Sequence, residues 1–178
     1  MSIGLIITLV VVAAIAIVLV LAARKPDSFH VQRSLRIDAT PERIFPLIDD
    51  IREHAHWSPF DQPDGKTTST FSEPSHGVGA EKLWSGNGKN GAGRYVNTVS
   101  VPASRVEARL QMTKPMACDH LVTFTLAPVG TATDVTWSLS GDVPYFAKIF
   151  HVFCDVDKMC GREFEKGLAA LKHRIEQA

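Results

Sequence analysis

The most constraining feature of this 178-residue sequence is an uninterrupted apolar run near its N-terminus. Between Ile3 and Ala23 there is no charged residue, and only Gly4 and Thr8 interrupt the apolar side chains. A helix of about 21 residues spans about 31 Å, which matches the hydrocarbon core of a bilayer. Because a helix satisfies its backbone hydrogen bonds internally, we predict a transmembrane anchor over residues 1–24, with the lipid bilayer as a partner.

A cleaved signal peptide is the alternative interpretation of the same run. Signal peptides carry a basic segment before the apolar core and a small-x-small cleavage site after it. Here no Lys or Arg precedes the run, and Ala14-Ile15-Ala16 lies in its middle, so we favour an uncleaved anchor. Arg24 and Lys25 follow the run directly, and the positive-inside bias then places the soluble domain on the cytoplasmic side.

The rest of the chain is predicted to form one domain. Residues 25–28 form a short linker, and residues 29–178 are numerous enough to bury a single core. The formal net charge of zero argues against nucleic-acid binding through a general basic field. The three cysteines follow no disulfide pattern, which agrees with a reducing compartment.

Local patterns predict the order of the elements within this domain. A strand over Phe29–Ala39 precedes a helix over Pro41–Asp50, which Pro46 should kink or end early, and a second short helical stretch reaches Trp57. Alternating side chains and turn clusters then indicate six further antiparallel strands: Lys66–Ser72, Ala80–Ser85, Arg94–Val101, Arg105–Met112, His120–Ala127 and Thr133–Ser140. One face of this sheet is apolar and must be covered.

The predicted cover is the last segment. From Pro144 to Gln177 apolar residues recur at helical spacing, and no proline follows the first residue. We predict one helix of about 30 residues, about 45 Å long, lying along the whole sheet. The fold class is therefore α+β, a curved antiparallel sheet around a long C-terminal helix, with a space enclosed between them.

Several segments carry a resemblance to a known superfamily. They are Arg33–Ala39 running into Pro41–Phe45, Trp57–Phe60, Gly77–Ala80 leading to Trp84–Asn87, Thr136-Trp137, Asp157–Met159 and Phe164–Leu168. In these residues and in element order the chain resembles the START/SRPBCC superfamily, which has the helix-grip fold, and more narrowly the membrane-anchored polyketide cyclase/dehydrase-like proteins of bacteria. The resemblance implies an apolar cavity that takes a hydrophobic ligand, and it requires no cofactor.

The candidate cavity residues are large apolar side chains on the predicted inner faces, together with one carboxylate. They are Trp57, Trp84, Met112, Phe124, Trp137, Phe150, Phe153 and Asp157. A helical wheel places Asp157 about 40° from Phe153, inside the apolar stripe. A carboxylate there must be paired, hydrogen-bonded or protonated. It is either tied to a sheet residue such as Lys82 or Arg94 or to loop amides, or it is a polar anchor or general acid/base for a ligand.

Two motifs are better explained without a functional site. Gly86–Gly91 matches the spacing of a dinucleotide-binding loop, but a strand follows it instead of a helix, so we predict a hairpin. His54 and His56 point to different sides of a helix, and no further ligand stands at a recognised spacing. We expect them at a solvated helix end and expect no metal site.

Three functions remain open at this point. The leading hypothesis is a membrane-tethered binding module for a lipid or another apolar small molecule. The second is a cyclase or dehydratase that uses Asp157 as acid/base in the same cavity. The third is an accessory subunit of a membrane protein complex, since Ala13, Ala14 and Ala16 allow close helix packing.

Overall fold

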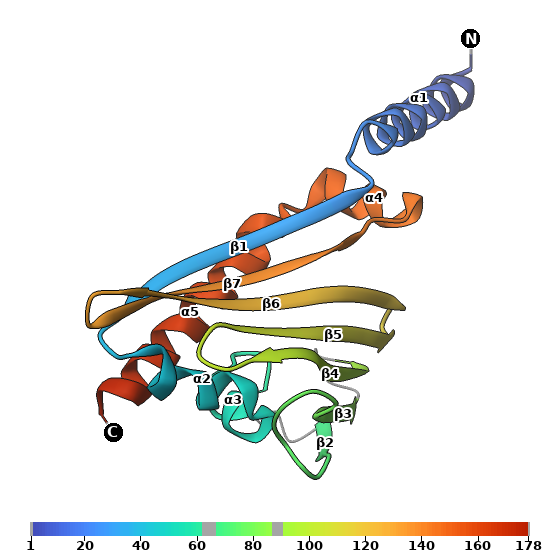
Figure 1. The fold of residues 1–178 in the computed structure, drawn as a ribbon. Coiled ribbons are helices and arrows are strands. Elements are labelled where there is room, and N and C mark those ends of the chain that lie inside the picture. Colours follow the sequence, from blue (N-terminus) through green and yellow to red (C-terminus); the bar gives the residue numbers. More distant parts are fainter. Residues whose placement is uncertain (1, 62–66, 87–90, 178) are drawn as a thin grey trace.

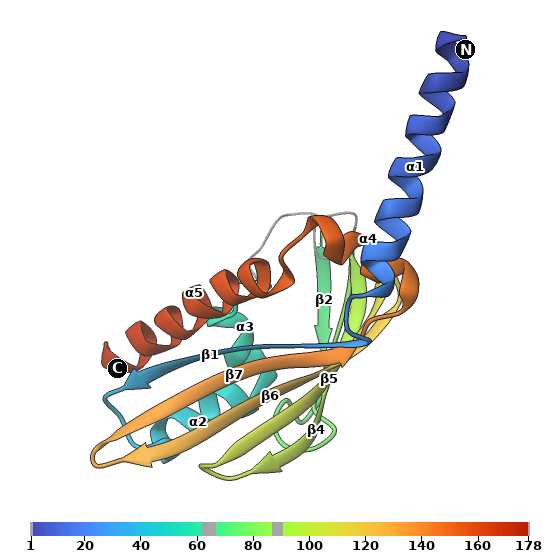
Figure 2. The same ribbon diagram turned by 90° about the horizontal axis from the view of Figure 1, so that it is seen from above.

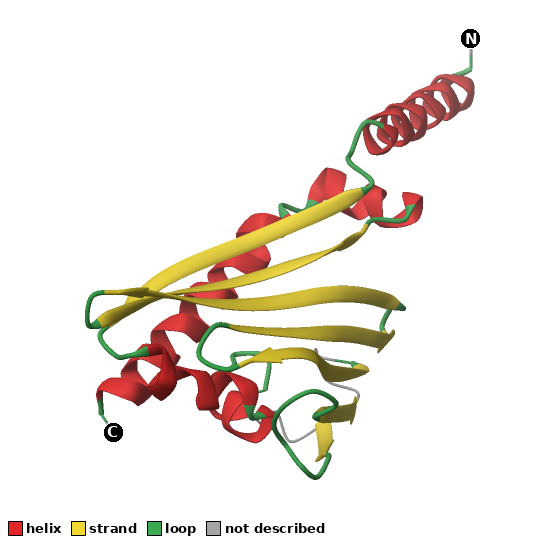
Figure 3. Cartoon of the chain, viewed as in Figure 1, coloured by secondary structure: helices red, strands yellow, loops and turns green. Residues whose placement is uncertain are grey.

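The structure, a computed structural model, describes residues 2–61, 67–86 and 91–177. Figures 1 and 3 show a curved sheet with helices packed on one side and an apolar helix projecting from one end. The helices are α1 (Ile3–Ala23), α2 (Pro41–Asp49), α3 (Ile51–Trp57), α4 (Tyr145–Phe153) and α5 (Val156–Glu176). The strands are β1 (Ser28–Ile37), β2 (Thr67–Phe71), β3 (Glu81–Gly86), β4 (Ala92–Val101), β5 (Arg105–Lys114), β6 (Cys118–Val129) and β7 (Ala132–Asp142).

The seven strands form one antiparallel sheet in the order β1-β7-β6-β5-β4-β3-β2. β1 is first in the sequence but pairs with β7, the last strand, so the two ends of the domain lie side by side. Figure 2 shows α5 running along one side of the curved sheet, with α2 and α3 near its C-terminal half. This arrangement is the helix-grip fold, and it confirms the α+β architecture expected from the sequence.

The core fills one half of the space between the sheet and α5. The strand register sets Val106 beside Phe124 and Phe124 beside Trp137 on the face that α5 covers. Phe164 of α5 stacks on Trp137 with ring centroids 4.4 Å apart, and Leu168 is buried in the same cluster. Aromatic stacking and close packing of this kind make that half a filled interior.

The C-terminal segment differs from the single helix that its periodicity predicted. It is interrupted at Cys154 and Asp155, both of which have extended backbone angles. The Asp155 carboxylate accepts a hydrogen bond from the Lys158 backbone N–H at 3.1 Å and so caps the start of α5. An aspartate in this position satisfies an amide that has no partner within the helix, which favours a new start over continuation. The prediction of one continuous helix was therefore wrong, and α4 takes its own direction.

That direction leads α4 to the end of the apolar helix α1. The Tyr145 hydroxyl donates a hydrogen bond to the Leu19 carbonyl oxygen at 3.0 Å. The Lys148 ammonium lies 2.6 Å from the Asp27 carboxylate in the linker that follows α1. Phe146 and Phe150, which the wheel placed in a buried stripe, are instead exposed because α4 packs on α1 and not along the sheet.

Candidate functional site

A cavity of about 1000 Å³ lies between the sheet and the helices α3, α4 and α5. Its wall is built mainly from aromatic and aliphatic side chains of the strands and of α5: Phe29, Trp84, Tyr95, Leu110, Met112, Val122, Trp137, Leu139 and Phe164. The cavity lies beside the filled core, with which it shares Trp137 and Phe164, and extends towards α4 and the turn between β5 and β6. This is the space that the sequence predicted between sheet and helix.

The register of the sheet and the break in the C-terminal helix explain why this half is open. Two rows of side chains continue the inner face beyond the core: Tyr95, Leu110 and His120 in one row, and Trp84, Met112 and Cys118 in the next. α5 begins only at Val156, and the preceding α4 turns aside to α1. α5 therefore does not cover these two rows as it covers the core, although His54 of α3 stacks on Tyr95 at one end of the first row.

The cavity reaches the surface beside α4. Among its lining residues, Met116 in the β5–β6 turn is 46% exposed, Phe150 in α4 is 50% exposed and Met159 in α5 is 51% exposed. These three side chains come from three different elements and mark a mouth between them. Because α4 packs on the C-terminal end of α1, the mouth lies close to the apolar helix.

A polar cluster lies among the apolar lining residues, where α3 and the following loop meet β3. We call Lys82, Asp61 and His54 the inner polar cluster. Lys82 and Asp61 form an ion pair, and their side chains are only 12% and 9% exposed. The Nδ1 atom of His54 lies 3.6 Å from Asp61 Oδ2. Lys82 shares an inner row with Tyr95, two residues along β3 from Trp84, whose ring lies 5.5 Å from the Lys82 ammonium.

Burial keeps the imidazole in this cluster uncharged. The ring of His54 stacks on Tyr95 at 5.6 Å and meets the edge of Trp57 at 4.5 Å. Burial in this aromatic surrounding lowers the pKa of His54 to about 3, and the positive charge of Lys82 acts in the same direction. Burial also lowers the pKa of Lys82 to about 8. At neutral pH His54 is therefore a neutral side chain beside an ion pair of no net charge.

The sequence did not predict this cluster. His54 was expected at a solvated helix end, and that expectation was wrong because α3 turns this face towards the sheet. One signal was present in β3, where Lys82 and Trp84 alternate with Leu83. Leu83 is exposed while Lys82 faces inward, which is the reverse of the usual pattern on a half-buried strand.

The structure brings four of the eight predicted site residues together at the cavity: Trp84, Met112, Trp137 and Phe150. Trp57 and Phe124 lie instead in the filled core, where they are almost completely buried. The Trp57 indole N–H donates to the Leu47 carbonyl oxygen at 2.7 Å, which fixes the ring there. Phe153 is 71% exposed at the end of α4 and does not line the cavity.

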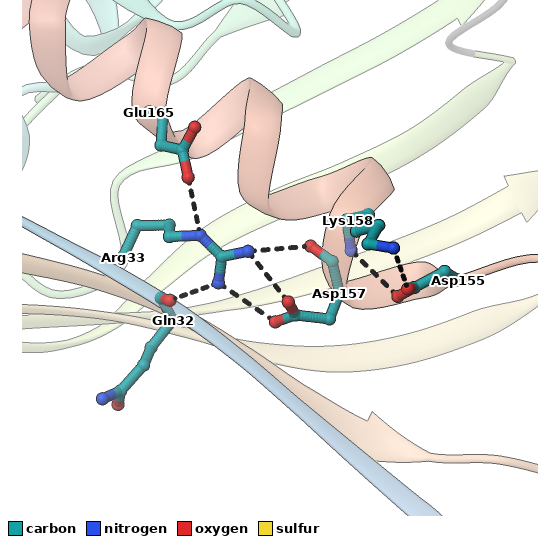
Figure 4. A network of polar contacts seen from close by, with 6 residues as sticks. All are labelled: Gln32, Arg33, Asp155, Asp157, Lys158 and Glu165. Carbon is teal, nitrogen blue, oxygen red and sulfur yellow. Dashed lines mark hydrogen bonds and ion pairs between the residues drawn. The ribbon is translucent and has the colours of Figure 1, made fainter.

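Asp157, the eighth predicted residue, lies outside the cavity in an ion-pair network with β1 (Figure 4). Arg33 donates to Asp157 Oδ2 at 2.9 Å and to Oδ1 at 3.0 Å, and its Nε donates to Glu165 at 2.9 Å. The hydrogen bonds from Arg33 lower the pKa of Asp157 below its usual value, so the carboxylate stays charged. The wheel misplaced Asp157 because it carried the phase of α4 through the break into α5.

The remaining sequence motifs contribute no site to the described part of the chain. Residues 87–90 of the glycine-rich motif lie outside the described residues, and the flanking strands β3 and β4 are antiparallel neighbours. Among the described residues, no three His, Cys, Asp or Glu side chains are grouped to hold a metal ion. Cys118, Cys154 and Cys160 are free thiols.

Comparisons with known proteins agree with this geometry. Residues 28–176 match the family described as polyketide cyclase/dehydrase and lipid transport. Protein CV1439 from Chromobacterium violaceum is 20% identical with a TM-score of 0.57, and 85% of this chain and 99% of that chain are covered. Protein MLL2253 from Mesorhizobium loti is 15% identical with a TM-score of 0.62, covering 84% and 98%.

A third similar structure is SA2116 from Staphylococcus aureus, 13% identical with a TM-score of 0.60, covering 85% of this chain and 96% of that chain. No curated protein matches the sequence. At these identities the solved structures establish the fold alone.

Proposed function

Because the chain belongs to the polyketide cyclase/dehydrase and lipid transport family, we propose that it is a binding module for a hydrophobic small molecule or lipid. The observation that carries this proposal is the apolar cavity of about 1000 Å³. Small-molecule pockets are typically roughly 300–1,000 Å³, mainly apolar and equipped with a few polar groups. A hydrophobic ligand that covers such a wall gains about 25 cal/mol for each Å² removed from water.

We further propose that α1 tethers this module to a membrane. Within α1 Ala22 is the one buried residue, so nearly all of its apolar side chains are uncovered. A lipid bilayer would cover them, and the length of α1 suits a single span. A signal sequence near the N-terminus passes the same test of length and composition, and the intact-mass measurement described below separates the two.

The position of α4 supports a mouth that opens at the lipid surface. The Tyr145 hydroxyl bonds to Leu19, which stands four residues before the end of α1, about 6 Å along its axis. Phe146, Phe150 and Phe153 are all exposed on α4. Exposed aromatic side chains at this depth are typical of helices that lie in a membrane interface. A ligand would then pass between bilayer and cavity with little exposure to water.

The contacts of the described residues do not specifically favour either alternative, the enzyme or the accessory subunit. The enzymatic hypothesis depended on Asp157. Its carboxylate lies outside the cavity and is paired with Arg33, which also pairs with Glu165. The hypothesis of an accessory subunit depended on the small residues of α1, whose exposed surface suits lipid and protein neighbours equally.

Extraction of bound lipids tests the binding proposal. The full chain would be purified from membranes in mild detergent, and its retained lipids would be extracted and identified by mass spectrometry. We expect a stoichiometric apolar species in the wild-type protein and a reduced amount in the variant Leu110→Trp, whose indole would take up part of the cavity. Detergent and bulk membrane lipids in the same proportions from both proteins would overturn the proposal.

Intact-mass measurement of the protein recovered from cells tests the tether. We expect residues 1–24 to be retained and the protein to stay in the membrane pellet after carbonate washing. A mature chain that begins after Ala23, recovered in the soluble fraction, would identify α1 as a signal sequence.

A further inference from the structure

Within the described residues, two buried nitrogen atoms at the wall of the cavity, one in the inner polar cluster and one beside it, have no hydrogen-bond partner. They are the Nε2 atom of His54 and the indole Nε1 of Trp137. Both residues line the cavity, and their ring centroids lie 6.1 Å apart. A buried polar group without a partner costs about 1–3 kcal/mol, which a ligand atom that bonds to it would recover.

The tautomer of His54 follows from its neighbours. Its Nδ1 faces the Asp61 carboxylate at 3.6 Å, which favours the hydrogen on Nδ1 and leaves Nε2 as an acceptor. Trp137 Nε1 is a donor and cannot accept. One buried acceptor and one buried donor therefore lie on neighbouring rings. A hydroxyl group complements both, because its oxygen accepts from Trp137 while its hydrogen is donated to His54.

The charges around the cluster disfavour an ionised head group. Of the described residues that line the cavity, Lys82 is the only lysine or arginine, and it is already paired with Asp61. The other charged lining residues are Asp27, Asp119 and Asp142. Asp27 and Asp119 are paired with Lys148 and Arg109, so these carboxylates add little net charge to the wall. At the cluster an anionic head group would meet the Asp61 carboxylate, and a cationic head group would meet the Lys82 ammonium. Either would also have to lose its hydration in an apolar surrounding.

We propose that the inner polar cluster, together with Trp137, is a subsite that recognises the uncharged hydroxyl group of an amphipathic ligand, such as a long-chain or polycyclic alcohol. The Asp61 carboxylate of the Lys82–Asp61 pair favours this tautomer of His54, and the rest of the cavity takes the apolar body of the ligand. This subsite rests on the proposed function, because it assumes that the cavity binds an apolar molecule.

A competition between probes that differ only in the head group tests the subsite. The full chain in lipid nanodiscs would be exposed to an equimolar mixture of 1-hexadecanol, hexadecyl methyl ether, hexadecanoate and hexadecylamine. The probes retained after repurification would be quantified and divided by their partition into protein-free nanodiscs. We expect hexadecanol to be enriched about three- to tenfold over the ether, which accepts from Trp137 but has no hydrogen to donate to His54, and about tenfold over both ions.

Substitutions at the cluster identify the atoms responsible. His54→Phe keeps an aromatic ring but removes Nε2, and Trp137→Phe removes the indole donor. His54→Phe should reduce the preference for hexadecanol over the ether about three- to tenfold and leave retention of the ether unchanged, because the ether has no hydrogen to donate to Nε2. Trp137→Phe should instead lower the retention of both probes and leave the preference between them unchanged, because both oxygens accept from the indole. His56→Phe, at an exposed position on the same helix, is the matched control and should leave the preference unchanged.

The outcomes separate the two proposals. Retention of all four probes in their partition ratio, or enrichment of an ionised probe, would overturn the subsite and leave the cavity as a nonselective apolar site. Retention of none would overturn the binding function and the subsite together. The wild-type comparison needs no substitution, so the test stands even where a variant fails to fold.

Discussion

The guanidinium group of Arg33 lies directly against Gly161, where a Cβ atom would collide with its Nη2 atom. From this position Arg33 reaches Asp157 one helical turn before Gly161 and Glu165 one turn after it. The missing side chain at position 161 thus allows a single arginine to join β1 to two turns of α5. This contact fixes the start of α5, and with it one wall of the cavity.

Gly161→Ala should therefore lower the free energy of unfolding. At an exposed position in a helix, Gly→Ala would raise the free energy of unfolding by about 1 kcal/mol because alanine has the higher helix propensity. A decrease on Gly161→Ala would therefore indicate that Arg33 packs closely against position 161. Denaturant unfolding in mild detergent measures it. In an Arg33→Ala background the collision is gone, and Gly161→Ala should become stabilising. A stabilising effect in the wild-type background would contradict the contact.

Two adjacent inward-facing positions on β5 should respond in opposite ways to added volume. Ala108 is completely buried in the filled core, so Ala108→Leu should cost about 1–3 kcal/mol through overpacking. Leu110 lines the cavity, so Leu110→Trp should change the free energy of unfolding little while it reduces ligand retention. Equal destabilisation by the two substitutions would show that the space beside Leu110 is filled.

The buried imidazole should make stability depend on pH. The pKa of His54 is lowered from 6.5 to about 3 in the folded protein, so between these values the unfolded chain binds a proton that the folded protein does not. Stability is therefore complete above about pH 6.5 and falls as the pH falls, by at most about 1.4 kcal/mol for each pH unit. Lys82, which faces His54, keeps its positive charge through this range.

Unfolding measured from pH 7 to pH 4.5 tests this slope. His120 and His151, whose pKa values burial also lowers, add to it in the wild-type protein. The informative quantity is therefore the difference between the wild type and His54→Phe, which should have the shallower dependence. His56→Phe should follow the wild type. Parallel curves for wild type and His54→Phe would mean that His54 is not buried as a neutral group.

The exposed end of α4 should lie in lipid. A tryptophan introduced by Phe153→Trp in the full chain should add emission that brominated lipids quench, because α4 is held against the end of α1 by Tyr145 and Leu19. Val129, exposed at the end of β6 in the opposite hairpin, supplies the control Val129→Trp, whose added emission should not be quenched. Equal quenching at both positions would contradict the proposed orientation.

Much of the fold follows from local patterns in the sequence. Strand alternation from Arg105 to Ser140 predicts β5, β6 and β7 because side chains on a half-buried sheet must alternate. The two short helices after β1 follow from Thr40 and Pro41 at the first start and from Ser58 and Pro59 after the second end. These signals act over a few residues, so they can be recognised in the sequence without knowledge of contacts between distant segments.

The candidate site was only partly predictable. Trp84, Met112 and Trp137 line the cavity, but alternation alone does not say whether an inner residue meets a helix or an open space. Phe124 has the same alternation on β6 but is core and does not line the cavity, and Trp57 on α3 is core as well. The difference arises from where α5 begins along the sheet, which depends on the cap that Asp155 provides.

Periodicity and turn residues within single segments were enough to predict the apolar N-terminal helix and the order of the strands, and the resemblance to the START/SRPBCC superfamily indicated the helix-grip fold. The break between α4 and α5, the pairing of Asp157 with Arg33 and the meeting of His54, Asp61 and Lys82 became visible only in three dimensions. These depend on the register of seven strands and on one break in a helix, which bring together residues far apart in the chain. The physical reason is that a cavity is space left between elements, and its position is a property of their packing.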